Sequence, residues 1–452
     1  MTLLNELSAE VCQRARMSRD PRFDGRFFVA VKTTGIFCRP ICPANLPKEE
    51  NVEYFSSQAL AVSAGYRPCL RCRPESAPHS WAWKGAETTF LRALTLIEQG
   101  ELDGSLETLA SRLGISDRYL RQLFQRHLGM PPKQYAQIQQ LMFAKQLLHT
   151  SQISITEVAY ASGFQSTRRF NDAFQKLFRL TPTQVRRERA ALPSRNHLSL
   201  AFRGPFDWAH MLDSYRLRAI EGMELVDEQS YQRHFVLGEG TGWFKASMAQ
   251  SHLDIEFEME RLSDLRHLVA RLRRMFDLDA DLISIEAHLE QLAPGLVRRT
   301  GIRIPGVWNA WEAGVRAVLG QQVSVKAAIG QLNLLVSTLA ASEGSTRYFP
   351  TPEQVQMSDL SFLRMPERRK ETLKRLADYV RLHPMDSPMA WLSLSGIGPW
   401  TVDYAQLRGE SRSHCFLTGD LIVKKALAKF PQLTAESVAP WGSYATFHCW
   451  SH

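Results

Sequence analysis

Apolar residues recur at helical spacing in "SLETLASRLGISDRYLRQLFQRHL", residues 105–128. The pattern stops at Gly114 and resumes after Ser116, a residue type that often caps the N-terminus of a helix. The same arrangement returns in "SITEVAYASGFQSTRRFNDAFQKLF", residues 154–178, again with a glycine at the turn. Each segment predicts a helix, a tight turn and a second helix. Residues 133–149 between them predict a linking helix.

The hydrophobic pattern changes in the second half of the chain. A polar stretch with a proline, "ERAALPSRNH" at residues 188–197, predicts a linker. Beyond it, "HLDIEFEM" at residues 252–259 alternates apolar and polar positions, which is typical of a half-buried strand. A chain of 452 residues is also too long for one ordinary core. We therefore expect several domains.

Composition and charge narrow the class of protein. With 44% hydrophobic and 22% charged residues the chain is typical of a globular protein. It has no long uncharged apolar run and no apolar N-terminal signal segment, so we expect an intracellular protein without membrane association. Residues 1–200 contain 27 Lys and Arg against 17 Asp and Glu, whereas the remainder contains 28 against 29. The first 200 residues are therefore the candidate polyanion-binding part.

Four of the seven cysteines form the pattern C-x3-C-x26-C-x2-C. These are Cys38, Cys42, Cys69 and Cys72. Two short-spaced pairs of reduced thiols supply the four ligands of a tetrahedral Zn²⁺ site. By spacing alone, a purely structural zinc knuckle is the alternative to a reactive centre. The remaining cysteines, Cys12, Cys415 and Cys449, lack such spacing.

The segments around the quartet carry a resemblance. "DGRFFVAVKTTGIFCRPIC", "ENVEYFSS" and "AGYRPCLRCRP" resemble the N-terminal zinc domain of the Ada family of DNA-alkylation response proteins. The resemblance implies one Zn²⁺ held by the four thiolates, with Cys38 accepting a methyl group irreversibly from a methylphosphotriester in DNA. Neighbouring cations would keep that thiolate reactive; they are Lys32, Arg39, Arg67, Arg71 and Arg73. Methylation would remove one negative charge from the site and so favour DNA binding.

The two helix-turn-helix patterns joined by a helix resemble the AraC-type DNA-binding domain. The resemblance implies that the second helix of each unit enters the major groove of promoter DNA. The residues expected to contact bases are Arg118, Arg121, Gln122, Thr167, Arg168 and Arg169. For each arginine the alternative is a solvated helix face. Asp172 stands where some relatives carry a basic residue that contacts bases. RNA polymerase is a further expected partner, and two units in one chain make a monomer sufficient.

The C-terminal half carries a third resemblance. "LSGIGPWTVDYAQLRG", residues 394–409, places Gly396 and Gly398 before a helix, where the backbone can approach a DNA phosphate. Together with Asp420 in "FLTGDLIVKKAL" and with "GIRIPGVWNAWEAGVRAVLGQQVSV", the segment resembles AlkA-type helix-hairpin-helix DNA glycosylases. "LSLAFRGPFDWAHML", residues 198–212, resembles the opening of the domain that precedes their core.

The glycosylase resemblance implies a chemistry. A buried carboxylate, Asp420, stabilises the oxocarbenium-like sugar while a cationic base, N3-methyladenine or N7-methylguanine, leaves. The extruded base stacks in a pocket of Trp400, Tyr404 and Trp450, and Gln322 stands where relatives insert an apolar wedge. The alternatives are a helix N-cap for Asp420 and an ordinary core position for Trp450.

Departures from the families limit the expected activity. Trp400 stands where strand-cleaving relatives carry a lysine, so we expect a monofunctional enzyme that leaves an abasic site. Only Cys449 follows Asp420, so we expect no iron-sulfur cluster. The Pro-Cys-His-Arg segment of the Ada methyl acceptor for O6-alkylguanine is absent, so that repair is not expected.

The sequence therefore predicts a multidomain fusion. The expected domains are a small α+β zinc domain (1–78), an all-α tandem helix-turn-helix domain (85–190), a small α+β domain with a TBP-like sheet (197–290) and an all-α helix-hairpin-helix glycosylase core (291–452). The expected protein is a cytoplasmic, nucleoid-associated bacterial repair enzyme and transcriptional regulator acting on double-stranded DNA. One alternative is a regulator whose degenerate glycosylase half only clamps DNA. Another is a repair enzyme that the zinc and helical units merely tether to DNA.

Overall fold

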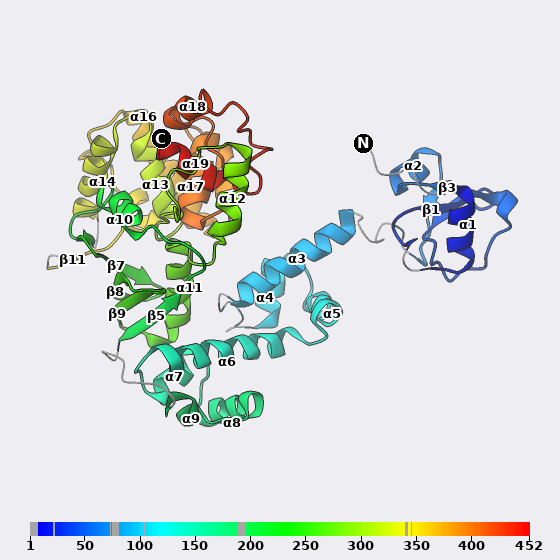
Figure 1. The fold of residues 1–452 in the computed structure, drawn as a ribbon, viewed down its shortest axis with the longest axis horizontal. Helices are drawn as coiled ribbons and strands as arrows, with labels where there is room; N and C mark the ends of the chain where they lie inside the picture. The colour runs from blue at the N-terminus through cyan, green and yellow to red at the C-terminus, as the bar shows by residue number, and fades with distance from the viewer. Residues whose placement is uncertain are drawn as a thin grey trace. The chain divides into compact units, whose positions relative to one another are not determined.

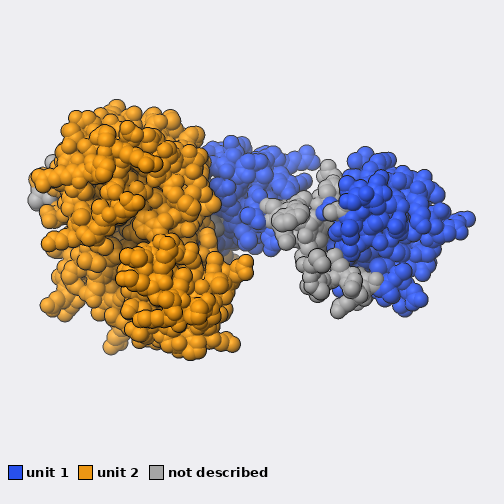
Figure 2. All heavy atoms as spheres, turned by 90° about the horizontal axis from the view of Figure 1, so that it is seen from above, with its two compact units in different colours: residues 1–139 blue, residues 140–452 orange. Residues whose placement is uncertain are grey.

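The computed structural model divides the chain into two compact units, Met1–Gln139 and Gln140–His452, which Figure 2 colours separately. The structure describes residues 8–20, 23–72, 74, 81–98, 100, 102, 105–187, 196–339, 342–344, 346–384 and 386–452. No helix among these residues is long and apolar enough to cross a bilayer.

The first part of unit 1 is a small sheet with a helix against each face (Figure 1). Its elements are α1 (Ala9–Met17), β1 (Phe28–Val31), β2 (Ile36–Cys38), η2 (Glu49–Asn51), β3 (Val52–Phe55), α2 (Gln58–Ser63) and β4 (Arg67–Pro68). The strand order is β3-β1-β2-β4, with β4 parallel to β2. Successive side chains of β1 face opposite sides. Val29 packs with Cys12 of α1, whereas Phe28 and Ala30 pack with Ala61 of α2.

The helical segments follow the predicted pattern. They are α3 (Trp81–Glu98), α4 (Leu106–Arg112), α5 (Asp117–Leu128), α6 (Pro132–Thr150), α7 (Ile155–Ala161), α8 (Thr167–Phe178) and α9 (Pro182–Arg187). Ser116 caps α5 as expected, because its hydroxyl accepts from the Tyr119 N–H. The linking helix α6 is one residue longer at each end than predicted. The early part of α6 packs in the first unit through Ala136, and its later part packs in the second unit through Leu147.

A five-stranded antiparallel sheet follows in unit 2, with the order β5-β9-β8-β7-β6. Its elements are β5 (His197–Ala201), α10 (Trp208–Arg216), β6 (Glu224–Val226), β7 (Ser230–Leu237), β8 (Gly240–Met248), β9 (His252–Met259), η4 (Leu262–Asp264) and α11 (Leu265–Met275). The predicted alternation in β9 is confirmed: Leu253, Ile255 and Phe257 are buried, and Met259 is half-buried. The second helix-turn-helix shares one hydrophobic cluster with this sheet.

Within its described residues, the C-terminal core is helical except for one short strand pair, β10 (Ser342–Glu343) and β11 (Thr346–Arg347), which the all-α expectation did not include. Its helices are α12 (Leu282–Leu292), α13 (Ala310–Gly320), α14 (Val325–Leu339), α15 (Pro352–Met357), α16 (Glu367–Leu382), η5 (Pro388–Ser393), α17 (Pro399–Glu410), α18 (Leu421–Leu427) and α19 (Gly442–Trp450). The central helix α13 is buried along most of its length. The expected boundary at 290/291 falls inside α12, which packs with α18 and α19.

Candidate functional site

Two strand ends bring the first and third cysteines of the quartet together. Cys38 is the last residue of β2, and Cys69 directly follows β4, the strand parallel to β2. The Cys69 N–H donates to the Phe37 carbonyl at 3.0 Å, which extends this pairing. A turn closed by the Cys42 N–H on the Arg39 carbonyl (3.1 Å) returns Cys42 to the same end of the sheet.

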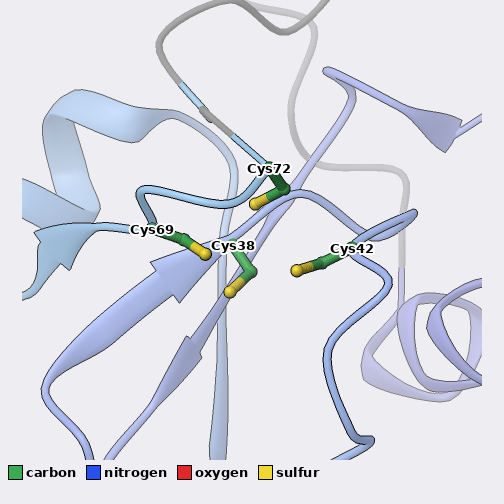
Figure 3. A group of neighbouring side chains, drawn as sticks. All are labelled: Cys38, Cys42, Cys69 and Cys72. Carbon is green, nitrogen blue, oxygen red and sulfur yellow. The ribbon is translucent and has the colours of Figure 1, made fainter.

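The four sulfur atoms point toward one centre (Figure 3) and lie within 4.8 Å of one another. Tetrahedral zinc with Zn–S bonds of about 2.3 Å needs sulfurs roughly 3.8 Å apart, so small side-chain movements suffice. Four cysteine sulfurs are also the donor set of many structural zinc sites. The chain therefore holds one Zn²⁺ through Cys38, Cys42, Cys69 and Cys72. Bound zinc keeps its sulfur ligands deprotonated at neutral pH.

The thiols affect one another's pKa values. The hydrogen bond to Cys72, together with burial, raises the pKa of the Cys38 thiol. The same hydrogen bond is the main reason that the pKa of Cys72 falls to about 5. Burial raises the pKa of Cys42. A bound divalent cation favours the thiolate form of all four ligands.

Exposure and backbone donors separate the four sulfurs into two pairs. Cys42 and Cys72 are only 8% and 9% exposed, whereas Cys38 and Cys69 are half-buried. The Arg39 N–H donates to Cys72 Sγ at 3.4 Å, and Cys42 also accepts a backbone hydrogen bond. Such bonds stabilise the charge of a thiolate and so make it a weaker nucleophile. As whole residues, Cys38 and Cys69 are therefore the more exposed pair, and no backbone donor to Cys38 Sγ is found within the described residues.

The cations expected around the zinc site differ in their contacts. Three of them are exposed, namely Lys32, Arg67 and Arg71. Arg39 instead forms an ion pair with the buried Asp24, to which its Nε donates at 2.8 Å. Its Nη1 also donates to the Cys72 carbonyl at 3.3 Å, so the Arg39 side chain braces the metal loop. Arg73 lies outside the described residues.

The residues expected to contact bases lie in the first two turns of α5 and in the first turn of α8. Five of them are exposed, namely Arg118, Arg121, Gln122, Arg168 and Arg169, and Thr167 is half-buried. Arg121 pairs with Asp117 of the same helix at 2.8 Å. Asp172 is also exposed on α8. The opposite face of α8 packs in the core through Phe170 and Phe174, so its polar face remains available to a partner.

The hairpin between η5 and α17 contains two glycines, and the fold requires glycine at only one of these positions. Gly396 has a φ of +93°, and an added Cβ would collide with Thr372 of α16, so the fold itself requires glycine there. Gly398 is the N-cap of α17 with a φ of −110°, and an added Cβ would meet nothing within 4 Å. The fold does not require this second glycine. Open space at a helix N-terminus is what an approaching phosphate needs.

Asp420 caps α18 and also contacts α19. Its Oδ1 accepts from the N–H groups of Ile422 (2.9 Å) and Val423 (3.2 Å), and from Trp450 Nε1 (3.1 Å). No donor to Oδ2 is found within the described part of the chain. The side chain is half-buried, not fully buried as expected, because it stands at the exposed first turn of α18. The cap and the indole fix one oxygen, and the other oxygen can face a ligand.

Three aromatic side chains lie in this part of the core: Trp450 donates to Asp420, Trp400 borders the turn before it, and Tyr404 stacks on Trp400. Trp400 and Tyr404 stack with ring centroids 5.3 Å apart and an interplanar angle of 25°. Trp450 packs edge-on against Phe447 at 4.9 Å. Trp400, Tyr404 and Trp450 are all half-buried against one hydrophobic cluster. An added Cβ on Gly419 would lie 3.9 Å from the Trp400 ring, so that ring borders the Asp420 turn.

Buried arginines lie close to Tyr404, and no sequence pattern pointed to them. Arg408, 1% exposed, places its guanidinium carbon 5.8 Å from the Tyr404 ring centroid. Burial alone would raise the pKa of Tyr404, but the positive charges of Arg408, Arg218 and Arg316 outweigh it and lower the pKa below its usual value. The Tyr404 hydroxyl is therefore held in a positive environment.

The loop between α13 and α14 contacts the hairpin through a residue that the sequence analysis passed over. Gln321 Nε2 donates to the Gly396 carbonyl and to Thr401 Oγ1, both at 3.2 Å. Gln322 is exposed with a φ of +57°, a conformation that non-glycine residues seldom adopt. Its amide is thus open to solvent in the free protein, and Val323 beside it is 41% exposed.

Three family models match the chain. The metal binding domain of Ada matches residues 11–75, a helix-turn-helix domain matches residues 109–188, and the AlkA N-terminal domain matches residues 197–309. These matches cover the zinc centre, most of the helix-turn-helix pair, and the five-stranded sheet with α11 and α12.

Curated relatives match in a pattern that follows the same division. DNA-3-methyladenine glycosylase 2 of Escherichia coli is 33% identical over 277 residues, 56% of this chain and 96% of that protein. The bifunctional transcriptional activator/DNA repair enzyme Ada of E. coli is 35% identical over 170 residues, 38% of this chain and 47% of that protein. The "probable bifunctional transcriptional activator/DNA repair enzyme AlkA" of Mycobacterium tuberculosis is 34% identical over 475 residues, 98% of this chain and 96% of that protein.

The match to the M. tuberculosis protein extends over the zinc domain, the helix-turn-helix pair and the C-terminal half. The class of protein is therefore an Ada-like regulator fused to an AlkA-type glycosylase. The chain belongs to the family of bifunctional transcriptional activator/DNA repair enzymes AlkA.

Proposed function

We propose that this protein removes alkylated purines from double-stranded DNA and also senses methylphosphotriesters as a transcriptional regulator. One observation carries the enzymatic part. Asp420 has one oxygen fixed by α18 and Trp450, while its second oxygen accepts no hydrogen bond in the described part of the chain, and the turn that carries Asp420 borders the Trp400 ring at Gly419. This is the arrangement that an extruded nucleotide needs.

The proposed reaction is hydrolysis of the N-glycosidic bond. Alkylation at N3 or N7 makes the purine cationic, so the base leaves as a neutral molecule with the electron pair of the C1′–N bond. A water oxygen bonds to C1′ and loses its proton to solvent. Oδ2 of Asp420 stabilises the positive charge that develops on the sugar. The half-buried position of the carboxylate leaves room for the sugar beside it.

The other residues proposed for this site bind DNA. The extruded base stacks on the aromatic group, where a cationic ring is attracted to the electron-rich faces of Trp400, Tyr404 and Trp450. Gln322 fills the gap in the duplex, since it is exposed on the loop that Gln321 ties to the hairpin. The amides at Gly396 and Gly398 bind a phosphate at the start of α17.

The enzyme is proposed to be monofunctional, because Trp400 stands where strand-cleaving relatives carry a lysine. Incubating methylated duplex DNA with the protein should therefore create sites that alkali cleaves, while the strands stay intact without alkali. Denaturing gel electrophoresis of the two samples measures both. Strand cleavage without alkali would contradict the monofunctional assignment, and no cleavable sites in either sample would contradict the glycosylase.

For the zinc domain we propose that Cys38 accepts the methyl group. Its sulfur bonds to the methyl carbon, the C–O bond of the triester breaks, and the phosphodiester leaves with the electron pair. Cys38 is one of the two half-buried cysteines of the quartet. A neutral triester can approach four thiolates on one Zn²⁺ more easily than an ordinary anionic phosphate can, which explains the selectivity.

For the helix-turn-helix pair we propose sequence-specific DNA binding. Selection from a random duplex library should yield a consensus sequence, and Arg169→Ala should lose preference at one base pair by about 1–3 kcal/mol. Arg179→Ala, at the far end of α8, is the control and should leave the consensus unchanged. If no consensus emerges with the unsubstituted protein, the helical units only tether the enzyme to DNA.

The remaining assignments rest on the family relationship and the element order. We assign the zinc domain to residues 1–78, the tandem helix-turn-helix domain to 85–190, the TBP-like sheet domain to 197–281 and the glycosylase core to 282–452, because α12 packs with the core and replaces the expected boundary at 290/291. RNA polymerase is the proposed partner of a monomer. The alternative, a degenerate half that only clamps DNA, is not favoured because the chain retains Asp420 and the hairpin and belongs to a family of bifunctional enzymes.

A further inference from the structure

Helix α16 directs a polar stripe toward the hairpin. Arg368, Thr372 and Arg375 stand at positions i, i+4 and i+7, so they share one face of the helix. Thr372 packs directly under Gly396, which has no room for a Cβ because of it. The stripe therefore lies against the loop that is proposed to bind a phosphate.

The two arginines of the stripe flank that contact. Arg375 Nη1 donates to the Ser395 carbonyl, the residue before Gly396, at 3.2 Å. Its side chain is still 41% exposed, so the guanidinium can contact the hairpin and an outside ligand together. Arg368 is exposed two turns earlier on the same face. Arg375 thus borders the hairpin, and Arg368 shares the helix face that does so.

Other charges on α16 have different surroundings. Lys370 pairs with Glu367 at 3.6 Å, and the positive charge of Lys374 acts on Asp359 in the loop before the helix. Glu371 pairs with Arg375 at 2.7 Å and is 53% exposed. Glu371 is thus the acidic group on the helix that borders the stripe. It would compete with an anionic ligand for Arg375.

We propose that Arg368 and Arg375 bind a backbone phosphate of the DNA strand next to the phosphate held by the hairpin. This inference rests on the proposed function, since it assumes that the hairpin faces DNA. Arg375 then exchanges its contact with Glu371 for a phosphate oxygen, which is another charge-assisted hydrogen bond. Helix α16 would then provide a second contact with the DNA strand that carries the lesion.

The chain offers a closely matched control. Arg381 also lies on α16, is 42% exposed and pairs with Asp378 at 2.8 Å. It stands six residues beyond Arg375, about 120° round the helix and so on a different face. Arg381→Gln removes the same charge from the same helix, away from the hairpin.

The test is fluorescence anisotropy of the full-length protein on a short duplex with an abasic-site analogue, over a range of salt concentrations and with undamaged competitor DNA. Arg368→Gln and Arg375→Gln should each weaken binding, and the slope of log K against log salt should become shallower by about 0.9 for each phosphate that the protein no longer neutralises. Glu371→Gln should tighten binding severalfold. Arg381→Gln should match the unsubstituted protein.

Unchanged salt slopes in both stripe variants would overturn the inference, as would an unchanged affinity in Glu371→Gln. Arg375→Lys keeps the charge and should keep the slope, which separates phosphate binding from bracing of the hairpin. Since the analogue requires no base release, the absence of these effects in an active glycosylase counts against the stripe alone. If the stripe variants show the expected changes in binding but the protein releases no base, the result counts against the proposed function and not against the stripe.

Discussion

Asp420→Asn should lower the single-turnover rate of base release from methylated duplex DNA by at least about 10²–10³-fold, because it removes the negative charge that faces the developing sugar cation. Asparagine is as good a helix N-cap as aspartate, and its side-chain oxygen can still accept from Ile422, Val423 and Trp450. The variant therefore removes the negative charge of Asp420 while keeping the N-cap of α18. Alanine would lose the cap as well, at a cost of about 1 kcal/mol.

Asp403→Asn is the matched control for this prediction. Asp403 is another half-buried carboxylate of the same core, on α17, and it takes no part in the proposed chemistry. Its variant should release bases at the rate of the unsubstituted protein. The thermal unfolding midpoint and DNA affinity should be unchanged in Asp420→Asn. A normal rate in that variant would show that the carboxylate charge does not drive the reaction.

The second large effect concerns the zinc centre. After incubation with DNA that carries methylphosphotriesters, one methyl group should appear per chain, on Cys38 and on no other cysteine. The transfer is stoichiometric because the thioether formed cannot return the methyl group. Fragment-ion mass spectrometry of the digested protein can distinguish Cys38 from Cys42 in the same segment and from Cys69 in another.

Mapping the methyl group on the unsubstituted protein is the decisive form of this experiment, since Cys38→Ala also removes a zinc ligand. Methyl on Cys69, the other half-buried cysteine, would reassign the acceptor. No methyl on any cysteine would leave the zinc centre with a structural role only. Cys42→Ser serves as a control for ligand loss, because Cys42 is buried and accepts a backbone hydrogen bond.

Local patterns predicted a good part of the molecule. The helix-turn-helix segments, the Ser116 cap and the alternation of β9 depend on neighbours within a few residues, so periodicity was sufficient to find them. The cysteine spacing predicted the metal centre for a similar reason. Each close pair lies on one short turn, and folding has only to bring two turns together.

Contacts between distant residues could not be predicted in this way. The sequence is compatible with Asp420 as a helix cap or as a catalytic group. The structure shows the cap, which uses one carboxylate oxygen and leaves the other without a hydrogen bond in the described residues. Trp450, which donates a hydrogen bond to Asp420, lies 30 residues after it in the chain. Gln321, which donates to the Gly396 carbonyl, lies 75 residues before the hairpin. No local sequence pattern predicts either hydrogen bond. The same holds for the pair of Arg39 with Asp24 and for the basic stripe beside Gly396. These depend on the packing of separate elements.

The measurement that tests the central claim most directly is chromatographic detection of free bases after the purified full-length protein has acted on methylated duplex DNA. We predict release of N3-methyladenine and N7-methylguanine by the unsubstituted protein and their absence with Asp420→Asn. If neither protein releases a base while both bind the DNA, the C-terminal half is a DNA clamp, and the chain is a regulator without glycosylase activity.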